Sequence, residues 1–468
     1  MKMSPSKIRG LALGWFCVFL SFTTTAIAGD TLSEVLKEKG VISKEDWIRI
    51  QAAKEKEEAE RKKLSSTDSQ VKAGWSKKGF TLETTDGKWK TALQWRFQGR
   101  FSYPERGDTD QPDSFTDNKE STFELRRVRM KIGGHGYEPW IKYYFEVDLQ
   151  STSNSGSSAG DTRLLDWRID LAKYQAFTIR VGQWKVNYNR ERVDSSGKQT
   201  FVERSIVTGP FTIDRQMGVL AMGRMFPGKM YDFRYYAGVF TGSGRGEAND
   251  DDNMMWMGRL QWNIWGRDLK WQQSDVEYHE QPTASLAFGG YTNIGKCTRW
   301  SSSGCGTLTP VNSLGAPYTP DSAAVDGEFR TDGMVEEFAM KWRGLAIQHE
   351  FHWKQVKDAG KPFTSGSPAA PPSKTNLMGS YAQVSYFPHY VIPFVPKPLE
   401  VAFRYAFVDP NVSAPNDVLR AYTAALNWFF AGHRNKITVD TTYFTLDQTP
   451  PLGQAHEQRV RLQWDVSF

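Results

Sequence analysis

The sequence has few cysteines, a low mean hydropathy and no strong excess of either charge. Only 3 of its 468 residues are cysteines, and the mean hydropathy is −0.55. After the first segment of the chain, no apolar run reaches the about 18 residues that a membrane-spanning helix requires. The sequence therefore excludes a protein that crosses a membrane with helices.

The first 28 residues have the three parts of a secretory signal peptide. Lys2, Lys7 and Arg9 form a basic start, and Leu11–Phe22 is apolar but short. Residues 26–28 read Ala-Ile-Ala, the small-residue pattern of a cleavage site. We therefore predict cleavage after this site and export of the mature chain, with an uncleaved anchor as the alternative.

The charge balance of the mature chain is nearly even. Removing residues 1–28 takes away three basic residues and no acidic ones, which leaves 56 basic and 53 acidic residues and a net charge of +3. This balance argues against a nucleic-acid partner, because such proteins carry a clear basic excess. Any functional charge must therefore lie in local clusters.

The mature chain keeps two cysteines, Cys297 and Cys305, in a stretch rich in glycine and serine. In an oxidising compartment two such cysteines close a small loop through a disulfide, and a pair of free thiols is the alternative. No histidine or acidic residue lies nearby at the spacing of metal ligands, so we expect neither a metal nor another cofactor.

The chain is rich in aromatic residues, and its polar and apolar residues alternate. Aromatic residues make up 13% of the chain, and 17 of them are tryptophans. From Trp89 onward the alternation has the period of a β-strand. The last segment, Gln458–Phe468, is the plainest case, with Leu462 and Trp464 opposing Arg461. Strands of about ten residues with aromatic residues near their ends are typical of a transmembrane β-barrel.

We count sixteen strand-like segments, an even number as expected when both ends of a closed barrel face the periplasm. They begin near residues 89, 121, 140, 163, 176, 216, 231, 254, 284, 334, 345, 376, 399, 419, 436 and 458. Short turns alternate with long polar loops, as they do in bacterial outer-membrane barrels. The predicted fold is an all-β, transmembrane antiparallel barrel of about 16 strands, surrounded by the lipid of the outer membrane of a Gram-negative bacterium and enclosing an aqueous channel.

Residues 29–74 differ from the rest of the chain. Leu32 and Leu36 keep helical spacing, and Ser43 with Asp46 resembles a capping box before a segment dense in Lys, Glu and Ala. This pattern predicts a short helical hairpin or weak coiled coil outside the membrane, either a solvated spacer or an oligomerising element. The predicted division is a signal peptide (1–28), a periplasmic helical segment with a linker (29–74) and a barrel domain (75–468).

Basic residues gather on the polar face of the first two predicted strands. Arg96 and Arg100 lie on the first strand, and the second carries Arg126, Arg127 and Arg129. The alternation slips between residues 125 and 128, which predicts a β-bulge that brings Arg126 to the side of Arg127. Guanidinium groups along a water-filled path attract phosphate-like anions. In the alternative interpretation nearby carboxylates neutralise them, and they serve only to hydrate the lumen.

Two further segments contribute basic residues. Arg459 and Arg461 on the last strand point into the same lumen, beside the first strand, with which the last one must pair to close the ring. Residues 183–215 follow the fifth strand, and their candidate residues are Lys185, Arg190, Arg204 and Arg215. Folded into the lumen, this segment narrows the pore, whereas an external loop does not. Its sequence alone leaves both arrangements open.

Several motifs resemble the phosphate-selective porin O and P family. They are Gly182-Gln-Trp-Lys185, Phe201-Val-Glu-Arg-Ser205, Phe123-Glu-Leu-Arg-Arg-Val-Arg129 and the stretch Leu164–Gln183. The similarity extends loosely over residues 75–468, and the helical preface is also common in that family. The resemblance implies a homotrimer of barrels whose third external loop folds inward. It also implies an arginine ladder that leads anions to a central site containing a lysine.

By this resemblance, the ladder and the central site comprise Arg100, Arg126, Arg127, Lys185 and Arg204. The family's phosphate-specific members bring further lysines from another infolded loop, but the corresponding residues 292–327 offer only Lys296 and Arg299. The leading hypothesis is therefore a porin for passive uptake of small anions such as phosphate or polyphosphate. A general diffusion porin without phosphate selectivity is the alternative.

A barrel enzyme and a plugged structural barrel are further alternatives. An enzyme that acts on lipid requires a serine, a histidine and an acid on the outer face, and the sequence pairs no serine with its histidines. His349 and His352 are three apart on one predicted strand, so they point to opposite faces and do not share a metal. We therefore expect no catalytic residues.

Overall fold

A computed structural model describes most of the chain. The described residues are 36–37, 39–66, 71–76, 79–104, 120–149, 162–249, 252–302, 304–306, 328–359, 374–447 and 454–468. The predicted signal peptide, residues 1–28, lies outside them. The chain divides into two compact units, residues 1–70 and residues 71–468.

The first unit contains one long helix, α2 (Lys44–Ser66). Its N-terminus has the predicted capping box: the backbone N–H of Asp46 donates to Ser43 Oγ at 3.0 Å, and Ser43 Oγ donates to Asp46 Oδ2 at 2.6 Å. The apolar residues of α2 do not gather on one face of the helix. No helix among the described residues is long and apolar enough to span a membrane.

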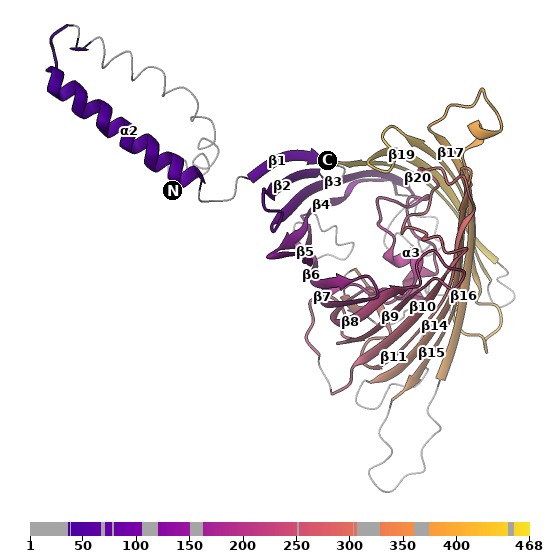
Figure 1. Ribbon diagram of the computed structural model, residues 1–468. Coiled ribbons are helices and arrows are strands. Elements are labelled where there is room, and N and C mark those ends of the chain that lie inside the picture. Colours follow the sequence, from indigo (N-terminus) through magenta and orange to yellow (C-terminus); the bar gives the residue numbers. More distant parts are fainter. Residues whose placement is uncertain are drawn as a thin grey trace, which may run out of the picture. The chain divides into compact units, whose positions relative to one another are not determined.

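The second unit is a closed antiparallel β-barrel whose wall, in the described residues, has sixteen strands (Figure 1). They are β3 (Lys90–Tyr103), β4 (Thr122–Gly136), β5 (Glu138–Asp148), β6 (Arg163–Tyr174), β7 (Phe177–Lys185), β8 (Arg215–Met225), β9 (Phe233–Phe240), β10 (Met255–Ile264), β11 (Thr283–Gly295), β14 (Phe329–Trp342), β15 (Leu345–Asp358), β16 (Lys374–Tyr386), β17 (Leu399–Asp409), β18 (Leu419–Phe429), β19 (Asn435–Asp447) and β20 (Gln454–Ser467). Each predicted strand start lies within five residues of the observed one. The predicted fold class is confirmed.

The ring closes between its first and last strands, as predicted. In the register of β3 and β20, Arg100 lies opposite Gln463, and Arg96 lies opposite Ser467. The N-terminal part of β3 pairs instead with β2 (Gly79–Thr84), which forms a hairpin with β1 (Val71–Ser76). The sequence did not predict this hairpin, because its strands are too short to show a clear alternation.

A few short elements complete the described part of the barrel. Between β7 and β8 lie two single-turn helices, α3 (Arg190–Val193) and α4 (Thr208–Phe211). A small hairpin of β12 (Arg299–Ser301) and β13 (Gly304–Gly306) follows β11, and a 3-10 turn, η2 (Pro388–Tyr390), precedes β17. In Figure 1, α3 lies inside the ring of strands.

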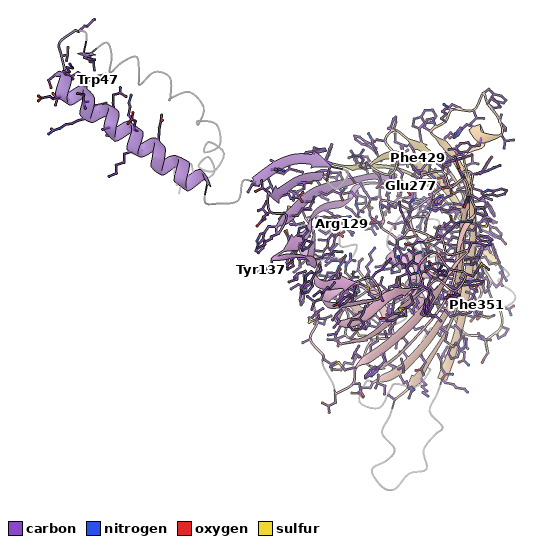
Figure 2. All side chains as sticks on the ribbon, in the orientation of Figure 1. Trp47, Arg129, Tyr137, Glu277, Phe351 and Phe429 are labelled. Carbon is purple, nitrogen blue, oxygen red and sulfur yellow. A yellow bond between two sulfur atoms is a disulfide. The ribbon has the colours of Figure 1, made fainter. Side chains whose placement is uncertain are left out.

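The two faces of the wall differ in polarity as the alternation predicted. On β20, Arg461, Gln463 and Asp465 are buried on the inner face, whereas Leu462 and Trp464 are exposed on the outer face. Arg129 lies on the inner side of the wall and Phe351 on the outer side (Figure 2). An apolar outer surface with a polar interior is the pattern of a barrel that is embedded in lipid.

Candidate functional site

The connection between β7 and β8, residues 186–214, folds into the barrel, and we call it the inner loop. Its backbone and side chains contact strands on the far wall. Val202 N donates to Asp440 Oδ2 on β19 at 3.0 Å, and Asn189 Nδ2 donates to Glu350 Oε2 on β15 at 2.9 Å. Of the two arrangements that the sequence left open, the structure has the inward one.

Two apolar clusters hold the inner loop against the wall. On one side, Ile206, Val207 and Phe211 of the loop pack against inward-facing residues of β15 to β19. On the other side, Val186 and Tyr188 pack against residues of β8 to β14. Burying one such side chain fully stabilises the folded state by about 1.5–3 kcal/mol, so these contacts fix the loop firmly. The interior beside β3 to β6 is left for polar side chains.

Glu203 of the inner loop binds three of the arginines that were predicted to form the ladder. Its carboxylate oxygen Oε1 accepts hydrogen bonds from Arg100 Nη2 at 2.6 Å, Arg126 Nε at 3.3 Å and Arg127 Nη2 at 3.2 Å. Burial opposes ionisation of this carboxyl, but Arg127, Arg100 and Arg126 outweigh it and hold the pKa of Glu203 well below its usual range. Glu124 Oε1 also lies 3.9 Å from Arg100 Nη1 and 3.8 Å from Arg126 Nε, so three positive charges face two negative charges.

The predicted β-bulge explains how adjacent arginines reach the same carboxylate. The register of β3 and β4 passes from Gln98 opposite Arg127 to Gly99 opposite Leu125, and it skips Arg126. In a regular strand, Arg126 and Arg127 point to opposite faces of the sheet. The extra residue of the bulge removes this alternation, so both side chains enter the lumen.

Arg96 and Arg129 extend the row of inward-facing arginines. Arg96 donates from Nη1 to Ser195 Oγ at 3.0 Å and from Nη2 to Ser196 Oγ at 2.8 Å, so it binds the tip of the inner loop. Arg129 instead pairs within the wall, with Glu146 and Asp148, both at 2.9 Å. The neutralising carboxylates of the alternative interpretation are therefore present at Arg129.

Two arginines of the inner loop hold its own fold and its contact with the wall. Arg190 Nη1 donates to the backbone oxygen of Lys270 at 3.1 Å, and its guanidinium lies 4.8 Å from the centre of the Trp271 ring. Arg204 donates from Nε to Glu191 O and from Nη2 to Asp194 O, both at 2.9 Å. These guanidinium donors of Arg190 and Arg204 therefore bind backbone oxygens of the protein itself.

Lys185 and Arg215 lie opposite each other at the two ends of the inner loop. Arg215 Nε donates to Asp166 Oδ1 at 2.5 Å, whereas Lys185 is half-buried. The adjoining Asp214 is fully buried. Although burial opposes its ionisation, Arg192 and Arg215 hold the pKa of Asp214 well below its usual range. The base of the loop is thus a compact network of opposite charges.

Arg459 and Arg461 of the last strand face inward, as predicted, but both have acidic partners. Arg461 binds Asp440 through Nε at 2.9 Å and through Nη2 at 3.0 Å. Arg459 Nη2 lies 3.0 Å from Glu457 Oε1, and its guanidinium lies over the Phe444 ring. Both side chains are buried.

A cavity of about 790 Å³, which we call the vestibule, opens at the end of the ring where β3 begins and β20 ends. Its basic lining residues are Lys90, Arg96, Lys131, Lys142, Arg168, Lys198 and Arg434, together with His135 and His433. Only two acidic residues, Asp170 and Glu277, line it. The vestibule therefore carries a clear excess of positive charge.

Three cations of the vestibule differ from those deeper in the barrel. Lys142, Lys198 and Arg434 are exposed, and none of them forms an ion pair within the described part of the chain. The site residues predicted from the sequence do not include these three. The alternation of β5 places Lys142 on the polar face, which was a usable signal. Lys198 lines the vestibule only because the inner loop folds inward, and Arg434 lies in a turn that has no alternation.

Cys297 and Cys305 form a disulfide with an S–S distance of 2.07 Å. The loop that it closes contains Trp300, which is buried in the cluster on the β8 to β14 side. Trp300 Nε1 donates to Gly242 O at 2.6 Å, and Lys354 Nζ of the wall donates to Thr298 O at 2.5 Å. The disulfide-closed loop after β11 is thus held against the inner face of the wall, as the inner loop is.

A closed ring of sixteen strands with an infolded loop and an inner row of arginines defines a barrel of the outer-membrane porin class. Residues 97–263 match the family model described as phosphate-selective porin O and P, which confirms the resemblance predicted from the motifs. No curated protein matches the chain.

Three solved structures are similar to the barrel. A loop L8 deletion mutant of OmpT, an outer membrane protein of Vibrio cholerae, is 10% identical, with 81% of this chain and 100% of that chain covered and a TM-score of 0.50. An anion-selective porin from Comamonas acidovorans is 11% identical, with 81% and 99% covered and a TM-score of 0.48. The outer membrane channel DcaP of Acinetobacter baumannii is 12% identical, with 82% and 99% covered and a TM-score of 0.48. The first of these likenesses shows the fold alone.

Proposed function

We propose that the barrel is an anion-preferring channel through which small anions diffuse across the outer membrane into the periplasm. The observation that carries this proposal is the vestibule, where Lys142, Lys198 and Arg434 are exposed and lack acidic partners in the described structure. Exposed charges of one sign on the wall of a confined aqueous space raise the local concentration of counter-ions.

The arginines around Glu203 support a path for anions between the constriction and the vestibule. Three guanidinium groups and two carboxylates, Glu203 and Glu124, leave a net charge of +1 beside the inner loop. A passing anion must compete with Glu203 for the guanidinium donors. Such competition weakens capture, and a solute that must also leave the channel requires weak, repeated binding rather than one tight site.

Phosphate-like anions are the solutes whose chemistry best fits these groups. Guanidinium donors form forked hydrogen bonds with phosphate oxygens, and a lysine ammonium adds a point charge. From the sequence pattern we further propose cleavage of the signal peptide after Ala28 and a periplasmic place for residues 29–74. From the family resemblance we propose assembly as a homotrimer.

The proposal is tested by electrical recording in planar lipid bilayers. Purified protein under a KCl gradient is expected to give stable channels whose reversal potential shows preference for chloride over potassium. Lys142→Gln combined with Lys198→Gln and Arg434→Gln is expected to lower this preference without changing barrel stability. Channels that prefer cations, or an unchanged reversal potential in the triple variant, would contradict the proposal.

Phosphate recognition is tested separately by adding phosphate to one side of the same bilayers. We expect phosphate to reduce the chloride current in a concentration-dependent manner, because both anions use the same guanidinium groups. A chloride current that phosphate leaves unchanged would leave an anion channel without phosphate recognition.

A further inference from the structure

The outer face of β14, β15 and β16 carries three basic residues in one row. Arg330, Lys357 and Lys374 lie directly opposite one another in the registers of β14 with β15 and of β15 with β16. Their neighbours along the strands, among them Thr331 and Val356, are buried on the inner face. Because successive side chains of a strand point to opposite faces, the three basic residues point outward. We call them the cation row.

The cation row lies at the extracellular end of the wall. β14 and β16 begin at this row, and β15 ends at it. Every second strand of the antiparallel ring runs opposite to β3, and β14 and β16 are among these strands. Because the first strand of such a barrel begins at the periplasmic end, β14 and β16 begin at the other one. The cation row is therefore at the level of the headgroups of the outer leaflet.

The like charges of the cation row repel one another and lack sufficient carboxylate partners. Side chains directly opposite each other on neighbouring strands have Cβ atoms about 4.5–5.5 Å apart, and like charges there destabilise a sheet. Lys374 is exposed and Lys357 is half-buried, and neither forms an ion pair within the described part of the chain. Arg330 Nε lies 3.1 Å from Asp332 Oδ2, and the arginine side chain remains 45% exposed. These four residues carry a net charge of +2, which favours an anionic ligand.

The outward-facing residues change from polar to apolar below the cation row. In the same registers, the next row consists of Asp332, Gln355 and Asn376. The row after that consists of Met334, Trp353 and Met378. A tryptophan between polar and apolar groups is typical of the boundary between headgroups and acyl chains. The three rows thus follow the order of polarity of a lipid with an anionic headgroup.

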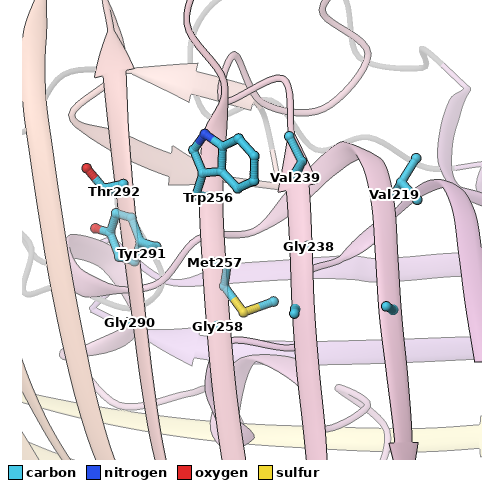
Figure 3. A pocket seen from close by; sticks show the side chains of 11 residues that line it. Val219, Gly238, Val239, Trp256, Met257, Gly258, Gly290, Tyr291 and Thr292 are labelled. Carbon is cyan, nitrogen blue, oxygen red and sulfur yellow. The ribbon is translucent and has the colours of Figure 1, made fainter. Parts of the chain in front are cut away.

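An apolar hollow of about 500 Å³ lies beside these rows, on the outer face of β8 to β11. It is lined by an in-register row of small residues, namely Ala221, Ala237, Gly258 and Gly290. In Figure 3, Trp256 and Thr292 lie above Gly258 and Gly290 and form one edge of the hollow. Gly290 lies opposite Met334 of β14, so the hollow is in register with the apolar row of β14 to β16.

The hollow and the polar rows adjoin each other. Thr292 Oγ1, at the edge of the hollow, donates to Asp332 Oδ1 at 2.6 Å. From β10 to β15 there are three strand spacings, or about 14 Å. A lipid with several acyl chains covers such a distance. A free phosphate ion would bind the cation row alone and leave the hollow without an occupant.

We propose that the extracellular half of the outer face of β8 to β16 binds a phosphorylated lipid with several acyl chains from the outer leaflet. The cation row binds the phosphate oxygens, because guanidinium and ammonium groups form charge-assisted hydrogen bonds with phosphate. One acyl chain lies in the hollow, and others pack on the apolar row below the cations. The bound phosphate offsets the repulsion within the cation row. This site is on the wall of the barrel and does not depend on which ions the channel prefers.

Native mass spectrometry of the detergent-purified protein, titrated with lipid, tests this site. The probes are diphosphoryl lipid A, the same lipid with its phosphates removed, and inorganic phosphate. We expect the protein to bind diphosphoryl lipid A roughly 10-fold or more tightly than the dephosphorylated lipid, because cations near a membrane surface add to the affinity for anionic lipids. Equal affinity for the two lipids, or displacement of the lipid by an equal concentration of inorganic phosphate, would overturn the proposal.

Removal of the cation row tests the headgroup contact. Arg330→Gln with Lys357→Gln and Lys374→Gln is expected to lower the affinity for diphosphoryl lipid A roughly 10- to 100-fold and to leave the affinity for the dephosphorylated lipid unchanged. Arg420→Gln is the control, because this outward-facing arginine of β18 is bound to Asp447 at 2.8 Å. A triple variant that binds diphosphoryl lipid A like the wild type would contradict the proposed site.

Filling the hollow tests the acyl-chain contact separately. A Cβ atom added at Gly258 meets no atom within 4 Å, and one added at Gly290 meets only Gly333 O, at 3.5 Å, so the barrel accepts larger side chains at both positions. We expect Gly258→Leu with Gly290→Leu to weaken the binding of both lipids while the heat-dependent gel migration of the folded barrel is kept. Ala382→Leu, at an exposed outward position of β16 away from the hollow, is the matched control. Lipid affinities that the filled hollow leaves unchanged would refute the acyl-chain contact.

Discussion

The cations near Glu203 and the cations of the vestibule have the same chemistry but different surroundings. Arg100 and Arg127 are buried and bound to a carboxylate, whereas Lys142 and Lys198 are exposed and form no ion pair in the described residues. Burying an unpaired charge is costly, so the deep arginines need Glu203 in order to be there at all. The cations of the vestibule are solvated by water and need no carboxylate partner, so they remain available to solutes. The comparison separates charges that hold the fold from charges that attract ions.

Glu203→Gln is expected to have the largest effect. It removes the carboxylate shared by Arg100, Arg126 and Arg127, and the loss of one partner from a buried ion pair costs about 3–5 kcal/mol. We expect a clear fall in the Tm of the folded barrel, measured by circular dichroism and by heat-dependent migration on gels. Glu277→Gln is the control, because Glu277 pairs with Lys270 at an exposed site, and it should leave the Tm nearly unchanged.

Lys354→Met tests whether the two infolded segments depend on the wall. Lys354 Nζ donates to Pro210 O of the inner loop at 2.7 Å and to Thr298 O of the disulfide loop at 2.5 Å. Methionine fills the same volume but leaves both carbonyls without this donor, at a cost of about 1–3 kcal/mol. We expect a lower Tm and noisier single-channel current. Lys357→Met, an outward-facing change on the same strand, should show neither effect.

Asp194→Asn is expected to have a pH-dependent effect. Asp194 is fully buried, neither of its carboxylate oxygens has a hydrogen-bond partner among the described atoms, and burial raises its pKa to about 7 against the opposing effect of Arg190. The unfolded chain ionises this group near pH 3.8, so wild-type stability falls as the pH rises toward 7 and stays reduced above it.

Asparagine cannot ionise and therefore avoids this loss. We expect the variant to exceed the wild-type Tm by ~2–4 °C at alkaline pH and to match it below the pKa of a free aspartate. The measurement is a pair of melting curves at each pH. An advantage that does not change with pH would show that the pKa of Asp194 is not raised in the folded barrel.

The smallest effect is expected for Arg126→Ala with Arg127→Ala, measured as reversal potential in bilayers. The change removes two positive charges beside Glu203 and Glu124, and Arg100 remains as the partner of both carboxylates. We expect a ~2-fold fall in the ratio of anion to cation permeability, smaller than that of the triple vestibule variant, because the paired charges attract passing ions less. An equal or larger effect would show that the paired arginines dominate selectivity.

The features that depend on local sequence pattern were predicted, and the structure confirms them. A strand has a period of two, so each residue's face follows from its neighbours, and all sixteen wall strands were predicted from that period. The bulge at Arg126 was also predicted, because a slip in the alternation is visible within four residues. The inward direction of Arg459 and Arg461 followed from the same rule.

Only the tertiary structure decided which distant parts of the chain contact each other. Glu203 meets Arg100 across 103 residues of sequence, and the vestibule joins Lys142, Lys198 and Arg434 from one strand, one loop and one turn. Likewise, no pattern aligns the three residues of the cation row, because their neighbourhood depends on the register of β14 to β16. By itself the sequence determined the barrel, the face of each strand and the presence of many inward-facing arginines. Folding decided which of these charges are neutralised, since that depends on where the inner loop comes to rest.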